Sequence, residues 1–200
     1  MLAAAVDDAA RERLRLLAGR VAPALSDGSV IGLRAMTGDD LERKVAWAND
    51  PAVNRQIGFL ERVELAGTRT WFHGQVEDPE VALLTLTRDD EAIGYVKLGA
   101  PLRGDTADYL GLAIGETRYW GRGYGTKAVA LLLEHLFAGP RWRALTGEWP
   151  TWNTRSIALH RKLGFTFAGE APPRRHPDGT IHAVDRMTIT RDVYEARRAG

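Results

Sequence analysis

The sequence predicts a single α/β domain built on one mixed sheet, and three observations support this prediction. The 200 residues are 44% hydrophobic, which suits one well-filled core near the upper end of ordinary domain length. Helical and β-rich stretches follow one another as strand, helix pair, three strands, helix, strand, helix and two strands. Neither an internal repeat nor a low-complexity linker divides the chain, so all the elements are expected to share one sheet.

In the N-terminal half, the spacing of apolar residues and the breaker residues define the elements. Residues 1 to about 27 form an Ala, Arg and Leu pattern typical of a helix, which ends at the breaker sequence of residues 26–28. Thr37 can cap the next helix, which stops before Pro51 and is followed by an ambiguous stretch. The remaining predictions are strands over residues 30–34, 81–87 and 93–98, the last two forming a hairpin, and a helix over residues 65–76.

In the C-terminal half, one apolar strand leads into one amphipathic helix. Residues 107–115 are mostly apolar and of strand length, which predicts a central strand buried on both faces. From residue 123 to 137 apolar side chains recur with the helical period, and Gly139 and Pro140 end the pattern. The remaining predictions are strands over residues 143–148, 165–169 and 180–190 and a helix over residues 153–163.

A glycine-rich segment, YWGRGYGTKA over residues 119–128, joins that strand to that helix. Gly121, Gly123 and Gly125 let the backbone turn sharply, and the helix start offers free N–H groups and a positive dipole end. Such a turn either binds phosphate or simply allows tight packing. It is neither a Walker loop, because no Gly-Lys-Ser/Thr ends it, nor a dinucleotide fingerprint, because its glycines alternate and come late in the chain.

Two segments together resemble the GNAT N-acetyltransferases. Residues 111–128 are similar to the coenzyme A pyrophosphate loop of that superfamily, and residues 153–165 to its second coenzyme A element. Residues 31–42, 49–54 and 178–189 further resemble the RimJ/RimL-like branch. The resemblance implies a mixed, mostly antiparallel sheet of six to seven strands, splayed in the middle and flanked by about four helices. Residues 29–200 would be the acetyltransferase domain and residues 1–28 an N-terminal helical extension.

The resemblance implies acetyl-coenzyme A as cosubstrate and indicates its contacts. Backbone amides of the loop would hold the pyrophosphate, with the Arg122 side chain adding positive charge, and the preceding strand would offer backbone groups to the pantetheine arm. Asn153, Ser156 and His160 share one helix face and would line the coenzyme tunnel, although Asn153 is equally suited to capping its helix. The loop amides are those of Arg122, Gly123, Tyr124, Gly125 and Thr126, and the strand residues are Ala113 and Ile114.

Catalysis in this family needs no protein nucleophile, which agrees with the absence of Cys. His160 stands where the family often has a Tyr that protonates the departing thiolate; it is either that acid, through its protonated fraction near pH 7, or a packed helical residue. Glu148 is either the general base, acting through water, or a solvated strand-end charge, and Asp108 and Tyr109 are the alternatives. Backbone N–H groups near Ala113 would contact the developing oxyanion.

The acceptor is expected to be a primary amine on a small molecule or peptide N-terminus, beside a wall formed by Trp149 and Trp152. An aminoglycoside is the alternative, and it would need an acidic cleft drawn from Asp39, Asp40, Glu61, Glu64, Glu77 and Asp78. A non-catalytic acetyl-coenzyme A sensor is the alternative of another class.

The composition excludes several other classes of partner. Because 27 Lys and Arg nearly cancel 26 Asp and Glu, neither nucleic acid nor an anionic membrane is an expected partner. The lack of Cys removes disulfides and the common zinc ligand sets, and no metal site is expected. No apolar run is long enough to span a bilayer and the N-terminus has acidic residues, so the cytoplasm is the expected location. A homodimer is left open.

Overall fold

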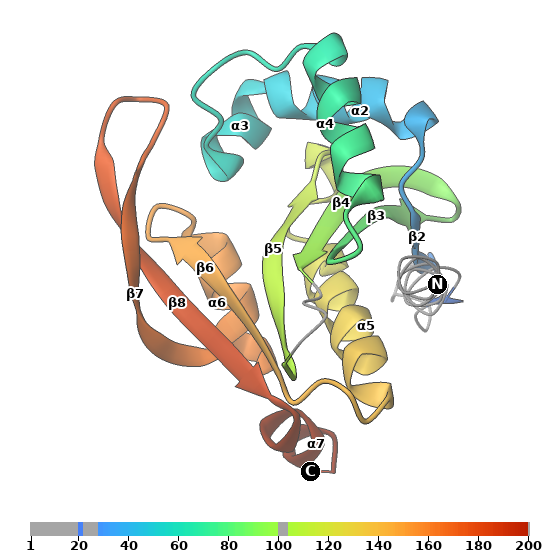
Figure 1. Cartoon of the computed structure of the whole chain (residues 1–200), viewed down its shortest axis with the longest axis vertical. Coiled ribbons are helices and arrows are strands. Elements are labelled where there is room, and N and C mark those ends of the chain that lie inside the picture. The colour runs from blue at the N-terminus through green and yellow to red at the C-terminus, as the bar shows by residue number, and fades with distance from the viewer. Residues whose placement is uncertain (1–19, 22–27, 100–103, 200) are drawn as a thin grey trace, which may run out of the picture.

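The computed structural model describes residues 20–21, 28–99 and 104–199, and its centre is one mixed sheet (Figure 1). The strand order is β1-β2-β3-β4-β5-β6-β8-β7, and every neighbouring pair is antiparallel except β5 and β6. The strands are β1 (Arg20–Val21), β2 (Ile31–Ala35), β3 (Val81–Arg88), β4 (Glu91–Gly99), β5 (Thr106–Ile114), β6 (Ala144–Pro150), β7 (Thr166–Arg175) and β8 (Ile181–Thr190). The predicted α/β fold is confirmed, with the two-residue β1 as an additional edge strand.

Within the described residues the α-helices number six, where about four were expected. They are α2 (Leu41–Asn49), α3 (Pro51–Ile57), α4 (Leu65–Glu77), α5 (Tyr124–Ala138), α6 (Thr154–Leu163) and α7 (Arg191–Ala199). In Figure 1, α2, α3 and α4 gather at one end of the sheet, whereas α5 runs along it. Most of the expected N-terminal helix lies outside the described residues; Arg20 and Val21 are in strand β1 instead, paired with β2.

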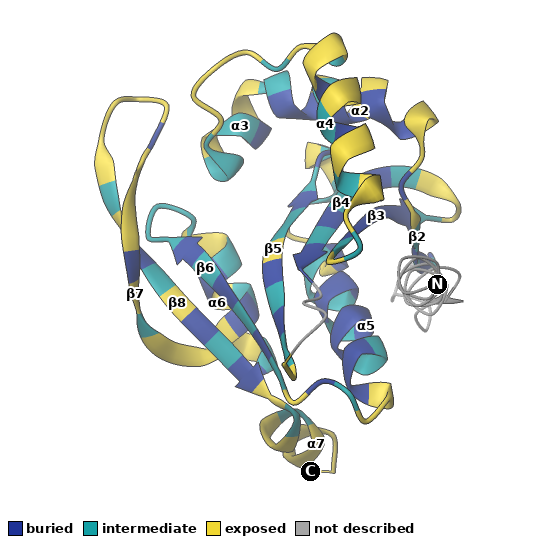
Figure 2. Cartoon of the chain, viewed as in Figure 1, coloured by how far each residue is buried: buried dark blue, intermediate teal, exposed yellow. Residues whose placement is uncertain are grey.

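The sheet separates a large hydrophobic core from a small one. Figure 2 shows buried residues along the central strands and along α5. Because side chains alternate along β3, Leu84 enters the large core against α5, and Leu83 enters the small core beneath α2 and α4. The large core contains the periodic residues of α5 that predicted that helix, among them Val129, Leu132 and Leu136.

The two central strands are paired over only part of their length. In β5, Thr106–Tyr109 pair with Ala144–Gly147 of β6, and beyond these residues the strands diverge (Figure 1). The prediction that β5 is buried on both faces is therefore wrong: Leu110, which follows the last paired residue, is 51% exposed. The pairing with β6 ends at Tyr109, whereas β5 continues to Ile114. The last residues of β5 therefore have no neighbouring strand on the β6 side.

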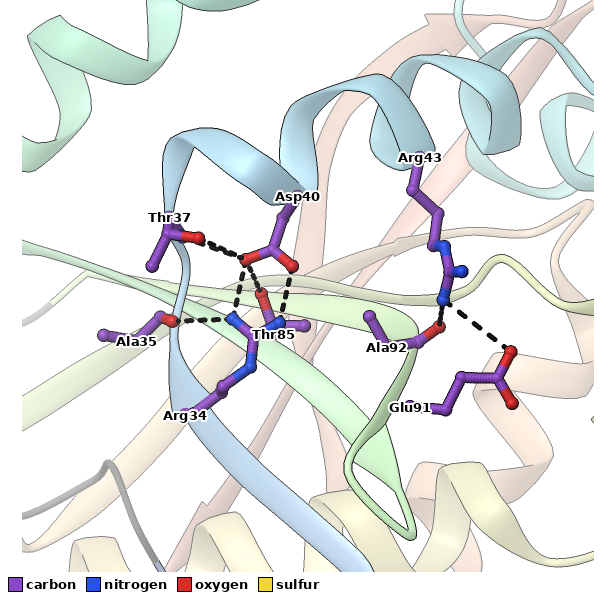
Figure 3. A network of polar contacts seen from close by, with 8 residues as sticks. All are labelled: Arg34, Ala35, Thr37, Asp40, Arg43, Thr85, Glu91 and Ala92. Atoms are coloured by element: carbon purple, nitrogen blue, oxygen red, sulfur yellow. Dashed lines mark hydrogen bonds and ion pairs between the residues drawn. The ribbon is translucent and has the colours of Figure 1, made fainter.

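The start of α2 is tied to the sheet through one carboxylate (Figure 3). Asp40, which is 7% exposed, accepts hydrogen bonds from Arg34 at 2.7 and 2.6 Å and from the Thr85 hydroxyl at 2.9 Å. Burial alone would raise the pKa of Asp40, but the hydrogen bonds from Arg34, the Thr37 amide and Thr85 hold it below its usual value. Later in the helix, Arg43 donates to the carbonyl of Ala92 at 2.7 Å. The position of α2 relative to β3 and β4 is thereby fixed.

Candidate active site

The glycine loop after β5 forms one wall of a cavity of about 540 Å³. Gly121 and Gly123 have φ angles of 73° and 85°, a conformation that side-chain-bearing residues rarely adopt. α5 begins at Tyr124, so the N–H groups of its first turn have no partner within the helix. Of the loop predicted to hold the pyrophosphate, Gly123, Tyr124, Gly125 and Thr126 line this cavity, whereas the Arg122 side chain is exposed and does not.

The residues around this cavity fit coenzyme A. α5 and α6 approach so closely that a Cβ at Gly125 would lie 2.9 Å from Cδ1 of Leu159. Arg155 and Lys162 of α6 add positive charge to the same cavity that the first turn of α5 lines, which suits phosphate. The indole N–H of Trp120 donates to the Ile114 carbonyl at 2.8 Å and so connects the loop to the end of β5.

The alternation of the β5 backbone decides which of its groups face the opening toward β6. The amide of Gly115 donates to the Ile93 carbonyl of β4 at 2.9 Å, so Ala113, two residues earlier, also directs its backbone groups toward β4. Leu112 and Ile114 then face the opening, and the Ile114 carbonyl already accepts from Trp120. Of the N–H groups near Ala113 from which the oxyanion contact was expected, those of Leu112 and Ile114 face the opening, and that of Ala113 itself faces β4.

A second cavity, of about 530 Å³, lies at the side of β5 that α2, α3 and α4 cover, and we call it the acceptor cavity. It shares six lining residues with the coenzyme cavity, and the two cavities meet where β5 and β6 diverge. The shared residues are Gln56, Ile57, Leu112, Ala113, Asn153 and Ser156. A thioester that reaches this rim is therefore accessible from the acceptor cavity.

His160 lines the coenzyme cavity but is almost completely buried, with 1% of its surface exposed. Burial lowers its pKa to about 4, against the opposing effect of a hydrogen bond to the Ser156 carbonyl. Nδ1 lies 2.7 Å from that carbonyl and 3.1 Å from the indole nitrogen of Trp149, whereas the second nitrogen, Nε2, has no hydrogen-bond partner among the described residues. Of the two roles expected for His160, acid and packed helical residue, its burial and lowered pKa favour the packed residue.

Glu148 lines the acceptor cavity, as expected, but both its carboxylate oxygens are in ion pairs. Arg174 donates to Oε2 at 2.7 Å and Arg186 to Oε1 at 3.1 Å, and these ion pairs stabilise the charged carboxylate. Burial, together with the charge of Glu148, raises the pKa of Asp108, which does not line this cavity. Burial also raises the pKa of Tyr109, which therefore keeps its proton and is not a base near neutral pH.

The two tryptophans predicted to form the acceptor wall have different surroundings. Trp149 borders the acceptor cavity, but it is 3% exposed and stacks on Tyr109 with 5.4 Å between ring centroids. Trp152 lies outside both cavities; its indole donates to the Gln56 carbonyl at 3.2 Å. Asn153 does cap α6, through a hydrogen bond from the Ser156 amide at 3.1 Å, and it also borders both cavities.

Sequence reasoning missed the two lysines of the acceptor cavity, Lys44 on α2 and Lys97 on β4. A lysine in an amphipathic helix ordinarily indicates a solvated face, and Lys44 is buried through contacts with residues distant in sequence, Phe59, Trp71 and Tyr95. It also missed α3, which supplies Gln56 and Ile57 to both cavities. The signal for α3 was present: Asp50 caps it by accepting from the Ala52 and Val53 amides, and Pro51 occupies its first position.

With this geometry established, the comparisons identify the family. Residues 31–166, more than half of the chain, match the acetyltransferase (GNAT) domain family. This chain belongs to the GNAT acetyltransferases. The enzyme is an N-acetyltransferase that uses acetyl-coenzyme A as its cosubstrate.

Three similar proteins illustrate the range of the family. A prophage-derived N-acetyltransferase of Bacillus subtilis is 24% identical over 84% of this chain and 94% of its own length. The L-methionine sulfoximine/L-methionine sulfone acetyltransferase of Pseudomonas paraeruginosa is 28% identical over 66% of this chain and 78% of its own. The structure of an aminoglycoside acetyltransferase in complex with coenzyme A has a TM-score of 0.70 at 24% identity, covering 84% of this chain and 99% of that one.

In the part of the chain that the structure describes, no helix is both long and apolar enough to cross a membrane.

Proposed function

We propose that this enzyme transfers the acetyl group of acetyl-coenzyme A directly to a primary amine of a small molecule or of a peptide N-terminus. The observation that supports this is the shared rim, where the coenzyme cavity opens into a separate acceptor cavity between the diverging β5 and β6. An amine in the second cavity meets the thioester there without a covalent intermediate on the protein. A relative named for small amino-acid-like acceptors agrees with a small-molecule substrate.

The chain's own groups divide the work of this transfer. The first turn of α5 and the glycine loop bind the pyrophosphate, and the Leu112 N–H, which faces the opening, stabilises negative charge on the carbonyl oxygen. Glu148 receives the amine's proton through water, and that proton is finally gained by the departing sulfur. His160, neutral and buried, shapes the wall of the coenzyme cavity instead of donating a proton.

The aminoglycoside alternative receives little support from the acceptor cavity. Of the six acidic residues that could have formed a cleft for a polycation, only Glu64 lines this cavity, and Asp40 is committed to Arg34. Only a turnover measurement distinguishes an acetyltransferase from a non-catalytic acetyl-coenzyme A sensor.

Further assignments belong to this proposal. We assign the enzyme to the RimJ/RimL-like branch on the segments quoted above, with residues 29–200 as the catalytic domain and residues 1–28 as an extension. A cytoplasmic location and a small-molecule partner, without nucleic acid or membrane, complete it.

The direct test is an acetyl transfer assay on amines of several classes: amino acids, amino acid amides, peptides with free N-termini, polyamines and aminoglycosides. Release of free thiol that depends on one of these amines is the expected result. Tight binding of acetyl-coenzyme A without transfer to any amine would contradict the proposed acetyl transfer and favour the sensor alternative.

The glycine loop provides a prediction about coenzyme binding. Gly123→Val puts a β-branched residue at a φ of 85°, which strains the loop whatever space surrounds it, and coenzyme affinity should fall by at least about tenfold. Gly179→Val is the matched control, because Gly179 has a φ of 90° but lies in the β7–β8 turn. Titration calorimetry that gives both variants the same coenzyme affinity would contradict the assignment of the loop.

The base assignment predicts that Glu148→Gln lowers kcat by roughly 10²-fold while coenzyme affinity stays unchanged. Asp108→Asn is the comparison, because Asp108 is the neighbouring carboxylate on β5. Single-turnover rates of both variants decide the matter: if Asp108→Asn is the slower variant, the proton is received by Asp108 instead.

A further inference from the structure

The most unusual charge in the acceptor cavity is Lys44. Its side chain is only 5% exposed, and it lines the cavity from α2. Three aromatic rings surround its ammonium, with Nζ 4.4 Å from the centroid of Trp71, 5.1 Å from Tyr95 and 5.9 Å from Phe59. Among the described residues it has no hydrogen bond and no ion pair. The ring faces attract a cation, but they accept none of its N–H groups in a normal hydrogen bond.

A second lysine adds to this charge. Lys97 projects from β4 into the same cavity, and its Nζ lies 5.9 Å from the Trp71 centroid, so the ring of Trp71 is close to both ammonium groups. Burial, and then the charge of Lys97, lowers the pKa of Lys44 to about 8. Two cations face the same cavity at an energetic cost that a nearby anion would offset.

No carboxylate of the described part of the cavity supplies that anion. Glu148 is held by Arg174 and Arg186, which occupy both its oxygens. Glu64 is exposed and faces Arg62 at 3.6 Å. With those ion pairs formed, the charge left without a partner in the acceptor cavity is positive.

The register of β4 and β5 places Lys97 close to the rim that the two cavities share. Lys97 pairs with Gly111 of β5, and the next residue, Leu112, belongs to the rim that both cavities share. An acceptor held at Lys44 and Lys97 by one end therefore has its other end free to face the thioester.

We propose that the acceptor of this enzyme carries a carboxylate as well as its amine, as an α-amino acid does, and that Lys44 and Lys97 bind that carboxylate. This inference rests on the proposed acetyl transfer and narrows its substrate class. The aromatic rings around Lys44 provide an apolar lining for the side chain of such an acceptor. The same charge pattern repels polyamines and aminoglycosides, whose amines are cations.

The test compares α-amino acids with their carboxamides as acceptors for the full-length enzyme. At pH 7 more of the amide has a neutral amine, so intrinsic reactivity favours the amide, and a preference for the acid reports on recognition. The expected result is a kcat/KM at least about tenfold higher for the acid than for its amide. A preference for the amide, for a polyamine or for phosphoethanolamine over every amino acid would overturn the carboxylate proposal while leaving acetyl transfer intact.

Two variants assign the recognition to the lysines. Lys44→Met keeps the length and apolar stem of the side chain, and it should raise KM for the acid at least about tenfold while leaving KM for the amide and coenzyme affinity unchanged. Lys97→Met, at a less buried position, should act in the same direction and keeps the test valid should the first variant misfold. Arg69→Met removes a positive charge from the exposed surface of α4 and is the matched control. Unchanged KM for the acid in both lysine variants would refute the carboxylate proposal. Absence of transfer to every amine would instead refute the proposed acetyl transfer.

Discussion

The imidazole of His160 lies in a box of aromatic rings, with centroids 4.8 Å from Tyr109, 4.6 Å from Trp149 and 5.0 Å from Phe165. Tyr109 comes from β5, Trp149 from β6 and Phe165 from the short connection between α6 and β7, so the helical face alone does not indicate the box. The environment favours the neutral imidazole, and its lowered pKa of about 4 makes His160 a contributor to stability that depends on pH.

The direction of that dependence follows from proton binding. The unfolded chain binds a proton at His160 near pH 6.5, whereas the folded chain does so only near pH 4, so acid favours unfolding. The contribution is fully present above about pH 6.5 and is lost as the pH falls toward 4. Between pH 7 and pH 5 the free energy of unfolding should decrease by about 2 kcal/mol on this account.

Urea denaturation at the two pH values measures this loss, and His160→Phe supplies the control. The variant keeps an aromatic ring in the box but cannot titrate, so its stability should change by about 2 kcal/mol less than that of the parent over the same interval. Equal pH dependence in the two proteins would show that His160 is not buried in the neutral form.

At the scale of one element, α2 shows how a buried polar contact positions the acceptor site. The carboxylate of Asp40 connects Arg34 of β2 and Thr85 of β3 to the start of α2, and that helix carries Lys44 one turn further on (Figure 3). The ammonium can be held against Trp71 only if the start of the helix is held against the sheet.

Asp40→Asn should therefore affect both stability and the acceptor. The amide cannot form the paired ionic contact with Arg34, and the free energy of unfolding should fall by about 2 kcal/mol, less than for a fully buried pair because Arg34 is 40% exposed. Asp39→Asn, at the exposed neighbouring position, should change it by less than about 0.5 kcal/mol. Urea titrations of both variants test this, and equal stabilities would contradict the anchoring role of Asp40.

The elements that the sequence predicted are those with strong periodicity or clear ends. The pattern of α5, with Val129, Leu132 and Leu136, and the turn at residues 88–91 both lie where expected. α3 and α7 were not predicted. α3 has only seven residues, too few for a periodic pattern, and α7 has no buried residue to mark a face.

The candidate site likewise has one part that the sequence predicted and one that it did not. The coenzyme loop is continuous in sequence, so its glycines and helix start could be predicted from spacing alone. The acceptor cavity is assembled from α2, α3, α4, α6 and strands β4 to β7, and its Lys44 and Lys97 are 53 positions apart with no local pattern to connect them. The burial of His160 likewise depends on strands that the sequence could not place around it.

The whole molecule consists of two parts of a sheet joined by a short parallel pairing. β5 and β6 are paired over four residues on each strand, ending at Tyr109 and Gly147, and α5 packs against α6 across the same division. The coenzyme cavity is lined from both sides of this division, by α5 and by α6. Coenzyme affinity should therefore respond to the spacing of the two parts, even where a substitution does not touch the cavity.

Gly147→Ala tests this dependence at the last paired residue. A Cβ there would lie 2.8 Å from the Tyr109 carbonyl oxygen and 2.7 Å from Cη2 of the buried Trp149, so β5 and β6 must separate to accept it. We expect a loss of roughly 1–3 kcal/mol in the free energy of unfolding and a severalfold weaker coenzyme affinity. Gly74→Ala in α4, where a Cβ meets nothing within 4 Å, is the control and should keep the parent affinity. Urea titration measures the stability and calorimetry the coenzyme affinity. A Gly147→Ala enzyme that is destabilised yet binds coenzyme normally would show that the coenzyme cavity tolerates movement of β6. The divergence of β5 and β6 would then matter for the acceptor cavity alone.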